Sequence, residues 1–70
     1  MSDHEEFQIR RYTKKELACL YYPTLTKDWA VKKFRRELKL NPKLRYMVDR
    51  SIHELSKLQV KQIIAELDTP

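Results

Sequence analysis

Hydrophobic positions recur with a helical period in four stretches of the chain, and each stretch follows a residue suited to capping a helix. The first stretch begins at Thr13, in the sequence Thr-Lys-Lys-Glu. In such a capping box the Thr13 hydroxyl accepts from the backbone N–H of Glu16, and the Glu16 side chain accepts from the backbone N–H of Thr13. The pattern predicts a helix over residues 14–21, with an apolar side formed by Leu17, Ala18, Leu20 and Tyr21.

The second stretch follows Pro23, which ends the first helix because proline disfavours helical geometry at the residue before it. Thr26 is the next capping residue, and it predicts a helix over residues 27–40. At about 100° of rotation per residue, one arc of this helix is apolar and is expected to face the core. That arc is formed by Ala30, Val31, Phe34 and Leu38.

Two further helices are predicted in the C-terminal half. Asn-Pro at 41–42 has the form of a cap followed by proline in a first helical turn, and it predicts a short helix over 42–49. Its inward residues are expected to be Leu44, Met47 and Val48. A second capping box at 56–59 predicts a helix over 57–67, with an apolar stripe of Val60, Ile63, Ile64 and Leu67.

A short strand is predicted before each capping box, over 7–12 and 51–55. We expect residues 8–12 to pair with residues 51–55. The predicted fold is therefore mainly α, of the α+β class, with four short helices, a helix-turn-helix-like pair and a small two-stranded β ribbon. The expected core is Leu17, Leu20, Phe34, Leu38, Val60, Ile63 and Ile64.

The length of 70 residues allows one domain, which we expect over residues 7–67. An acidic N-terminal segment, 1–6, is expected to be disordered, and residues 68–70 form a short tail. No apolar run approaches the roughly 18 residues of a membrane span, and the N-terminus lacks the apolar core of a signal peptide. Cys19 is the only cysteine, which excludes an internal disulfide. We therefore expect a cytoplasmic protein with no membrane association.

Several of these motifs occur in a fixed order that is similar to a known family. The chain has Phe-x-Ile-Arg-x-Tyr at 7–12, Glu-Leu-Ala-x-Leu-Tyr-x-Pro at 16–23, then Leu25-Thr26, Ala30, Arg35-Arg36 and Asn41-Pro42-Lys43-Leu44. This order resembles a short uncharacterised family of Bacteroidota proteins, a domain of unknown function. The resemblance covers nearly the whole chain and supports the fold, but it implies no activity. The chain departs from the family at Glu37, where an aromatic is common, and at Asp68, where glycine is common.

The net charge of +5 is concentrated in the middle of the chain. Residues 27–50 carry nine basic and three acidic side chains, whereas residues 1–26 carry four of each. A clustered basic patch is typical of proteins that bind polyanions. A solvated helix face without a ligand is the alternative interpretation of the same charge pattern.

The predicted helices at 14–21 and 27–40, joined by a short Pro-containing turn, indicate a helix-turn-helix pair that binds duplex DNA with its second helix. The turn at 22–25 is longer than usual and lacks glycine. The alternative is an adaptor or inhibitor that docks an acidic protein surface, and a homodimer is left open. The candidate binding residues are Trp29, Lys32, Lys33, Arg35, Arg36, Lys39, Lys43 and Arg45.

Trp29 lies about 100° away from Ala30 on the helical wheel, outside the apolar arc. One interpretation is that it packs against the Tyr21-Tyr22 turn or the helix at 42–49. The other is that it is an exposed aromatic that contacts a partner protein or an unpaired base.

Enzymatic function has little support in the sequence. Glycine is absent, which excludes the glycine-rich loops that cradle phosphates. Neither His4 nor His53 has cysteine or carboxylate neighbours at metal-site spacing, and Cys19 is expected to be structurally neutral. We therefore expect no catalytic residues, no cofactor and no metal.

Overall fold

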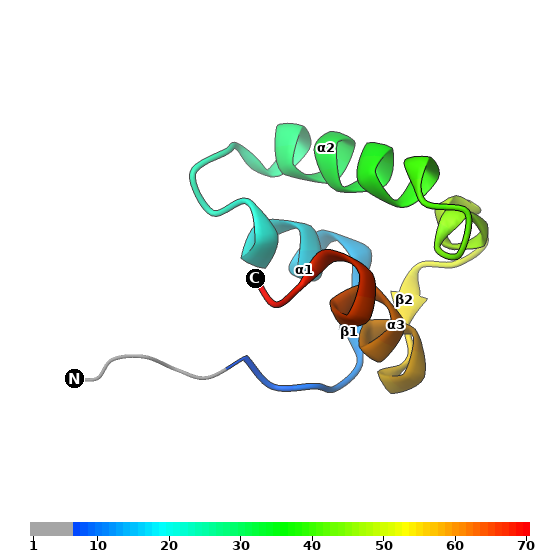
Figure 1. The fold of residues 1–70 in the computed structure, drawn as a ribbon. Coiled ribbons are helices and arrows are strands. Elements are labelled where there is room, and N and C mark those ends of the chain that lie inside the picture. Colours follow the sequence, from blue (N-terminus) through cyan, green and yellow to red (C-terminus); the bar gives the residue numbers. More distant parts are fainter. Residues whose placement is uncertain (1–6) are drawn as a thin grey trace.

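The computed structural model of the chain describes residues 7–70, and in this range it contains three α-helices, each begun by a side-chain cap (Figure 1). Helix α1 (Lys14–Tyr21) begins with the predicted box: the Thr13 hydroxyl accepts from the Glu16 N–H at 3.1 Å, and the Glu16 carboxylate accepts from the Thr13 N–H at 2.9 Å. The prediction for residues 1–6 lies outside the described residues.

Helices α2 and α3 also have the predicted bounds. Helix α2 (Lys27–Leu40) begins at Thr26, whose hydroxyl accepts from the Trp29 N–H at 3.4 Å. Helix α3 (Lys57–Leu67) begins with the second box, between Ser56 and Gln59. Capping residues together with apolar periodicity therefore predicted the starts of these three helices correctly.

The predicted helix over 42–49 is wrong, because this segment forms turns followed by a short 3₁₀ helix (Arg45–Val48). The Leu44 N–H donates to the Asn41 carbonyl and the Met47 N–H to the Leu44 carbonyl, so the bonds span three residues instead of four. Residues three apart are eclipsed in this geometry, which brings both Leu44 and Met47 into the core. The chain therefore has three α-helices where the sequence predicted four.

The two predicted strands do pair, but over fewer residues than expected. Strand β1 (Tyr12–Thr13) pairs antiparallel with β2 (Glu54–Leu55), with Tyr12 opposite Leu55. The pairing predicted for 8–11 is wrong because the chain there bends around the Tyr12 ring. The Tyr12 hydroxyl donates to the Gln8 carbonyl at 2.7 Å, and the Phe7 ring stacks on the Tyr12 ring at 5.4 Å.

The core lies between the helices and is formed by buried residues from every element: Tyr12, Leu17, Ala18, Ala30, Phe34, Leu38, Leu44, Met47, Leu55, Val60 and Ile63. Leu20 was wrongly predicted to belong to it and is 44% exposed. The buried side of α1 is centred on Leu17 and Ala18, and the Tyr21 ring stacks on the Phe34 ring at 5.5 Å, which turns Leu20 outward. Ile64 is only partly buried, at the edge of the core.

Helices α1 and α2 pack against each other and run in opposite directions, joined by the segment at 22–26 (Figure 1). The end of the chain returns to α1, where the Tyr21 hydroxyl donates to the Asp68 carbonyl. The long helix α2 therefore has one side on the core and the other side open to solvent. Within residues 7–70, no helix is long and apolar enough to cross a membrane.

Candidate functional site: the basic face of α2 and a neighbouring pocket

The side of α2 opposite Phe34 carries four exposed cations, which we call the α2 basic face: Lys32, Arg35, Arg36 and Lys39. Residues spaced three and four apart lie on one side of a helix, so these side chains share a continuous surface. Phe34 and Leu38, on the other side, are almost fully buried. The burial of this apolar side leaves the basic side facing solvent.

The charge of the α2 basic face is not neutralised by ion pairs within residues 7–70. The salt bridges in this range join Arg11 to Glu54 and Lys43 to Glu66. None involves a side chain of the α2 basic face. An exposed group of like charges without counter-charges attracts anions, and the attraction extends over about 8–10 Å at ordinary salt.

The remaining predicted basic residues separate into different environments. Lys43 pairs with Glu66 at 3.6 Å, and the pKa of Glu66 is lowered by the Asn41 amide first and by Lys43 second. The Arg45 side chain donates from Nε to the Lys39 carbonyl at 3.3 Å, which brings Arg45 to the C-terminal end of the α2 basic face. Lys33 lies with its Nζ 5.4 Å from the centre of the Tyr22 ring.

Trp29 is 63% exposed, so the interpretation that it packs as a second small cluster is wrong. Tyr21 packs on Phe34 and Tyr22 instead, and the Tyr22 ring is covered by Lys33. The Trp29 ring has Lys32 Nζ 5.0 Å from its centre. Leu40, eleven residues further along the same side of α2, is 67% exposed. An exposed aromatic and an exposed aliphatic side chain thus border the α2 basic face.

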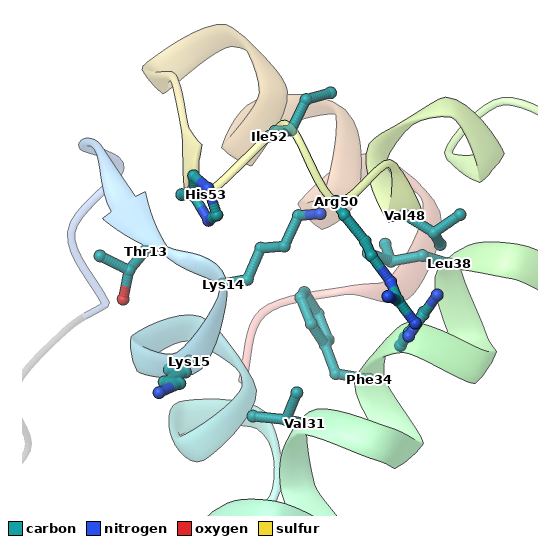
Figure 2. A pocket seen from close by; sticks show the side chains of 11 residues that line it. Thr13, Lys14, Lys15, Val31, Phe34, Leu38, Val48, Arg50, Ile52 and His53 are labelled. Atoms are coloured by element: carbon teal, nitrogen blue, oxygen red, sulfur yellow. The ribbon is translucent and has the colours of Figure 1, made fainter.

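A pocket of about 530 Å³ lies beside α2, and the sequence did not predict it (Figure 2). Figure 2 shows Lys14 extending across it from the start of α1, with Phe34 on the α2 side and Arg50 descending from the segment before β2. We call it the Lys14 pocket; it is lined by Thr13, Lys14, Lys15, Val31, Phe34, Arg35, Leu38, Val48, Arg50, Ile52 and His53.

The Lys14 ammonium group is held at this pocket by a backbone contact. Its Nζ donates to the Asp49 carbonyl oxygen at 2.9 Å. Its pKa is lowered, first by burial and second by the positive charge of Arg35, while the Asp49 carboxylate acts in the opposite direction. That carboxylate accepts from the Ser51 N–H and hydroxyl, and its own pKa is lowered mainly by these bonds.

The pocket residues come together through the strand pair. In the antiparallel register, the residue after β1 lies opposite the residue before β2, and the Lys14 N–H donates to the His53 carbonyl at 3.2 Å. The correct strand register could have predicted this pocket, because it sets Lys14 opposite His53 and close to Arg50. The sequence predicted only that residues 8–12 pair with residues 51–55, without a register, so this proximity was missed.

Two side chains considered for chemistry from the sequence, His53 and Cys19, lie in different segments of the fold. His53 lines the Lys14 pocket, and Cys19 is half-buried in α1. Within the described part of the chain, no three His, Cys, Asp or Glu side chains form a group that could hold a metal ion.

Residues 8–70 match the model of a protein family described as Domain of unknown function (DUF4248). The match includes every helix and strand described above. No curated protein and no solved structure matches the chain.

Proposed function

Because the chain belongs to DUF4248, a family of unknown function, we propose from its geometry that it is a small binding module that holds duplex DNA through the α2 basic face. The observation that carries the proposal is the group of four exposed cations with no ion-pair partner within residues 7–70. They occupy eight consecutive residues, about 11 Å of helix axis. DNA carries one negative charge per 1.7 Å or so of its axis, so several phosphates lie within reach.

We propose that the contacts are made mainly to phosphates. The two helices of a helix-turn-helix cross at roughly 90–120°, whereas α1 and α2 run in opposite directions along each other (Figure 1). A helix packed in this way presents its side to DNA, and side-chain cations then position the duplex without selecting a sequence. Arg45 extends the contact at the C-terminal end of α2.

The test is a fluorescence anisotropy titration with a random 20-base-pair duplex at several salt concentrations. The variant Arg36→Gln/Lys39→Gln should weaken binding and lower the slope of log K against log salt by about 0.9 per lost contact. The variant Lys57→Gln/Lys61→Gln is the matched control, because it removes the same charge from exposed positions of α3. Equal losses from both variants, or no binding at low salt by the intact protein, would refute the proposal.

A second candidate function is supported by Trp29 and Leu40, which are both more than 60% exposed and border the same basic face. Exposed Trp and Arg side chains are the types enriched in protein-binding hot spots. An acidic protein surface with an apolar pocket would fit this arrangement. Trp29 is the only tryptophan, so its emission reports contact directly. A blue shift with an acidic partner protein, and none with duplex DNA, would favour this candidate.

A further inference from the structure

The Lys14 pocket combines an apolar floor with a cationic border. Its floor is formed by side chains of α2, the 3₁₀ helix and the segment before β2: Val31, Phe34, Leu38, Val48 and Ile52. Four basic residues, Lys14, Lys15, Arg35 and Arg50, also line it, and none of the lining residues is acidic. Its volume of about 530 Å³ is within the usual range for small-molecule sites, roughly 300–1,000 Å³.

The cations at the border are arranged so that an anion between them would be stabilised. Lys14 uses one of its three N–H groups on the Asp49 carbonyl, which leaves two for another acceptor. Both Lys14 and Arg35 line the pocket, and the positive charge of Arg35 contributes to lowering the pKa of Lys14. The Asp49 carboxylate accepts hydrogen bonds from Ser51. A bound anion would oppose this like-charge repulsion in a partly desolvated place, where electrostatic interactions are stronger than in water.

We propose that the Lys14 pocket binds a small amphipathic carboxylate, with its apolar body on the Phe34 side and its carboxylate between Lys14 and Arg35. Transfer of an alkyl body from water onto the floor is favourable in itself. The charged border then selects for the headgroup. A medium-length acyl chain, such as that of decanoate, is the class of ligand that combines an alkyl body for the apolar floor with a carboxylate for the basic border.

This inference is independent of DNA binding except at Arg35, which lies on the α2 basic face and also lines the pocket. Arg36 and Lys39 carry the same charge on the same helix and do not line the pocket. The two functions are therefore separable by substitution. Loss of carboxylate binding would leave the DNA proposal intact, and the reverse also holds.

The experiment is a ¹H–¹⁵N NMR titration of the full chain with decanoate, kept below its micelle concentration. We expect saturable shifts at the amides of Val31, Phe34 and Ile52. Decanol, which lacks the charge, and acetate, which lacks the apolar body, should each bind at least tenfold more weakly. Equal affinity for decanoate and decanol would overturn the proposal, as would shifts spread over the whole surface.

Two variants test the site. Arg35→Gln should weaken decanoate binding at least fivefold, whereas Arg36→Gln, the matched control, should leave it unchanged. Val31→Phe should fill the pocket and abolish saturable binding, with the NMR spectrum of the variant showing that it stays folded. If Val31→Phe unfolds the chain, Lys14→Gln/Arg35→Gln serves instead. Equal weakening by Arg35→Gln and Arg36→Gln would mean that only net charge matters, and the proposed site would be wrong.

Discussion

Asp68 follows the last residue of α3 and has a positive φ of 68° with ψ of 174°. This backbone region is occupied almost entirely by glycine, because a Cβ atom meets steric conflict there, and other residues in it are strained by about 1–3 kcal/mol. The carbonyl of Asp68 is held by the Tyr21 hydroxyl. The strained residue is thus also the one that attaches the end of the chain to α1.

We expect Asp68→Gly to stabilise the domain by about 1 kcal/mol through relief of this strain. For a chain of this size such a gain raises the melting temperature by roughly 4–8 °C. Asp68→Ala is the control, because it removes a carboxylate that is unfavourable at a helix C-terminus but keeps the Cβ atom. Thermal unfolding followed by circular dichroism measures both. A gain for alanine as large as for glycine would show that charge, not backbone geometry, limits stability here.

Phe34 and Leu20 test the boundary of the core. Phe34 is almost completely buried and stacks on Tyr21, so Phe34→Ala should cost about 3–5 kcal/mol, which is enough to unfold a 70-residue domain at 25 °C. Leu20→Ala should cost less than about 1 kcal/mol, because Leu20 is already 44% exposed. Urea unfolding distinguishes the two. Comparable losses would mean that Leu20 belongs to the core after all.

At the scale of elements, the helices could be predicted because their signals are local. Thr13, Thr26 and Ser56 lie within three residues of the groups they cap, and the predicted bounds of α1, α2 and α3 agree with the structure. The segment at 42–49 has a capping residue too, but tertiary burial of Leu44 and Met47 selects a 3₁₀ geometry. The extent of β1 depends on the Phe7–Tyr12 stack, which alternation of apolar residues does not reveal.

The two capping boxes should respond differently to pH. The pKa of Glu16 is lowered, mainly because its carboxylate accepts from the Thr13 N–H, whereas Gln59 in the second box does not titrate. A carboxyl group with a lowered folded pKa stabilises the fold fully above its unfolded pKa, near 4.5, and this contribution is lost as the pH falls through the folded value. The loss of this contribution to stability should therefore begin near pH 4.5 and continue as the pH falls further.

Glu16→Gln should retain the box and reduce this acid sensitivity. We expect the urea midpoints of the two proteins to be close at pH 7, since glutamine is an effective partner in capping boxes. Between pH 4.5 and pH 3 the midpoint should fall less for the variant than for the original protein. Identical slopes would mean that Glu16 does not contribute to acid unfolding. Asp49 and Glu66 should contribute to the remaining slope, because their pKa values are lowered mainly by hydrogen bonds from Ser51 and from Asn41 respectively.

For the whole molecule, charge distribution could be predicted from the sequence, whereas shape could not. The exposed cations of α2 follow from a helical wheel, because Phe34 and Leu38 determine which side is buried. The Lys14 pocket depends on contacts between residues more than thirty positions apart, such as Lys14 with Asp49. Its residues carry no common local pattern, so a single sequence gives no signal for it without the correct strand register.

If the like charges of the α2 basic face are retained for binding, their repulsion should lower the stability of the domain. The variant Arg36→Glu tests this. In α2, position 36 is three or four residues from Lys32, Lys33 and Lys39, so the change converts three like-charge neighbours into attractive pairs. At roughly 0.2–0.5 kcal/mol per pair, the variant should be about 1 kcal/mol more stable at low salt, and the gain should shrink as salt is added.

The same Arg36→Glu variant should bind duplex DNA at least tenfold more weakly, since it puts a negative charge among the proposed phosphate contacts. Lys61→Glu, with the same change of charge on an exposed position of α3, is the control for net charge alone. Melting temperature and DNA anisotropy should be measured on both variants at 20 and 200 mM salt, concentrations at which the screening length changes about threefold. Greater stability together with a selective loss of DNA binding is the result expected of a binding surface. Greater stability with DNA binding equal to that of Lys61→Glu would mean that the α2 basic face is only a solvated helix side.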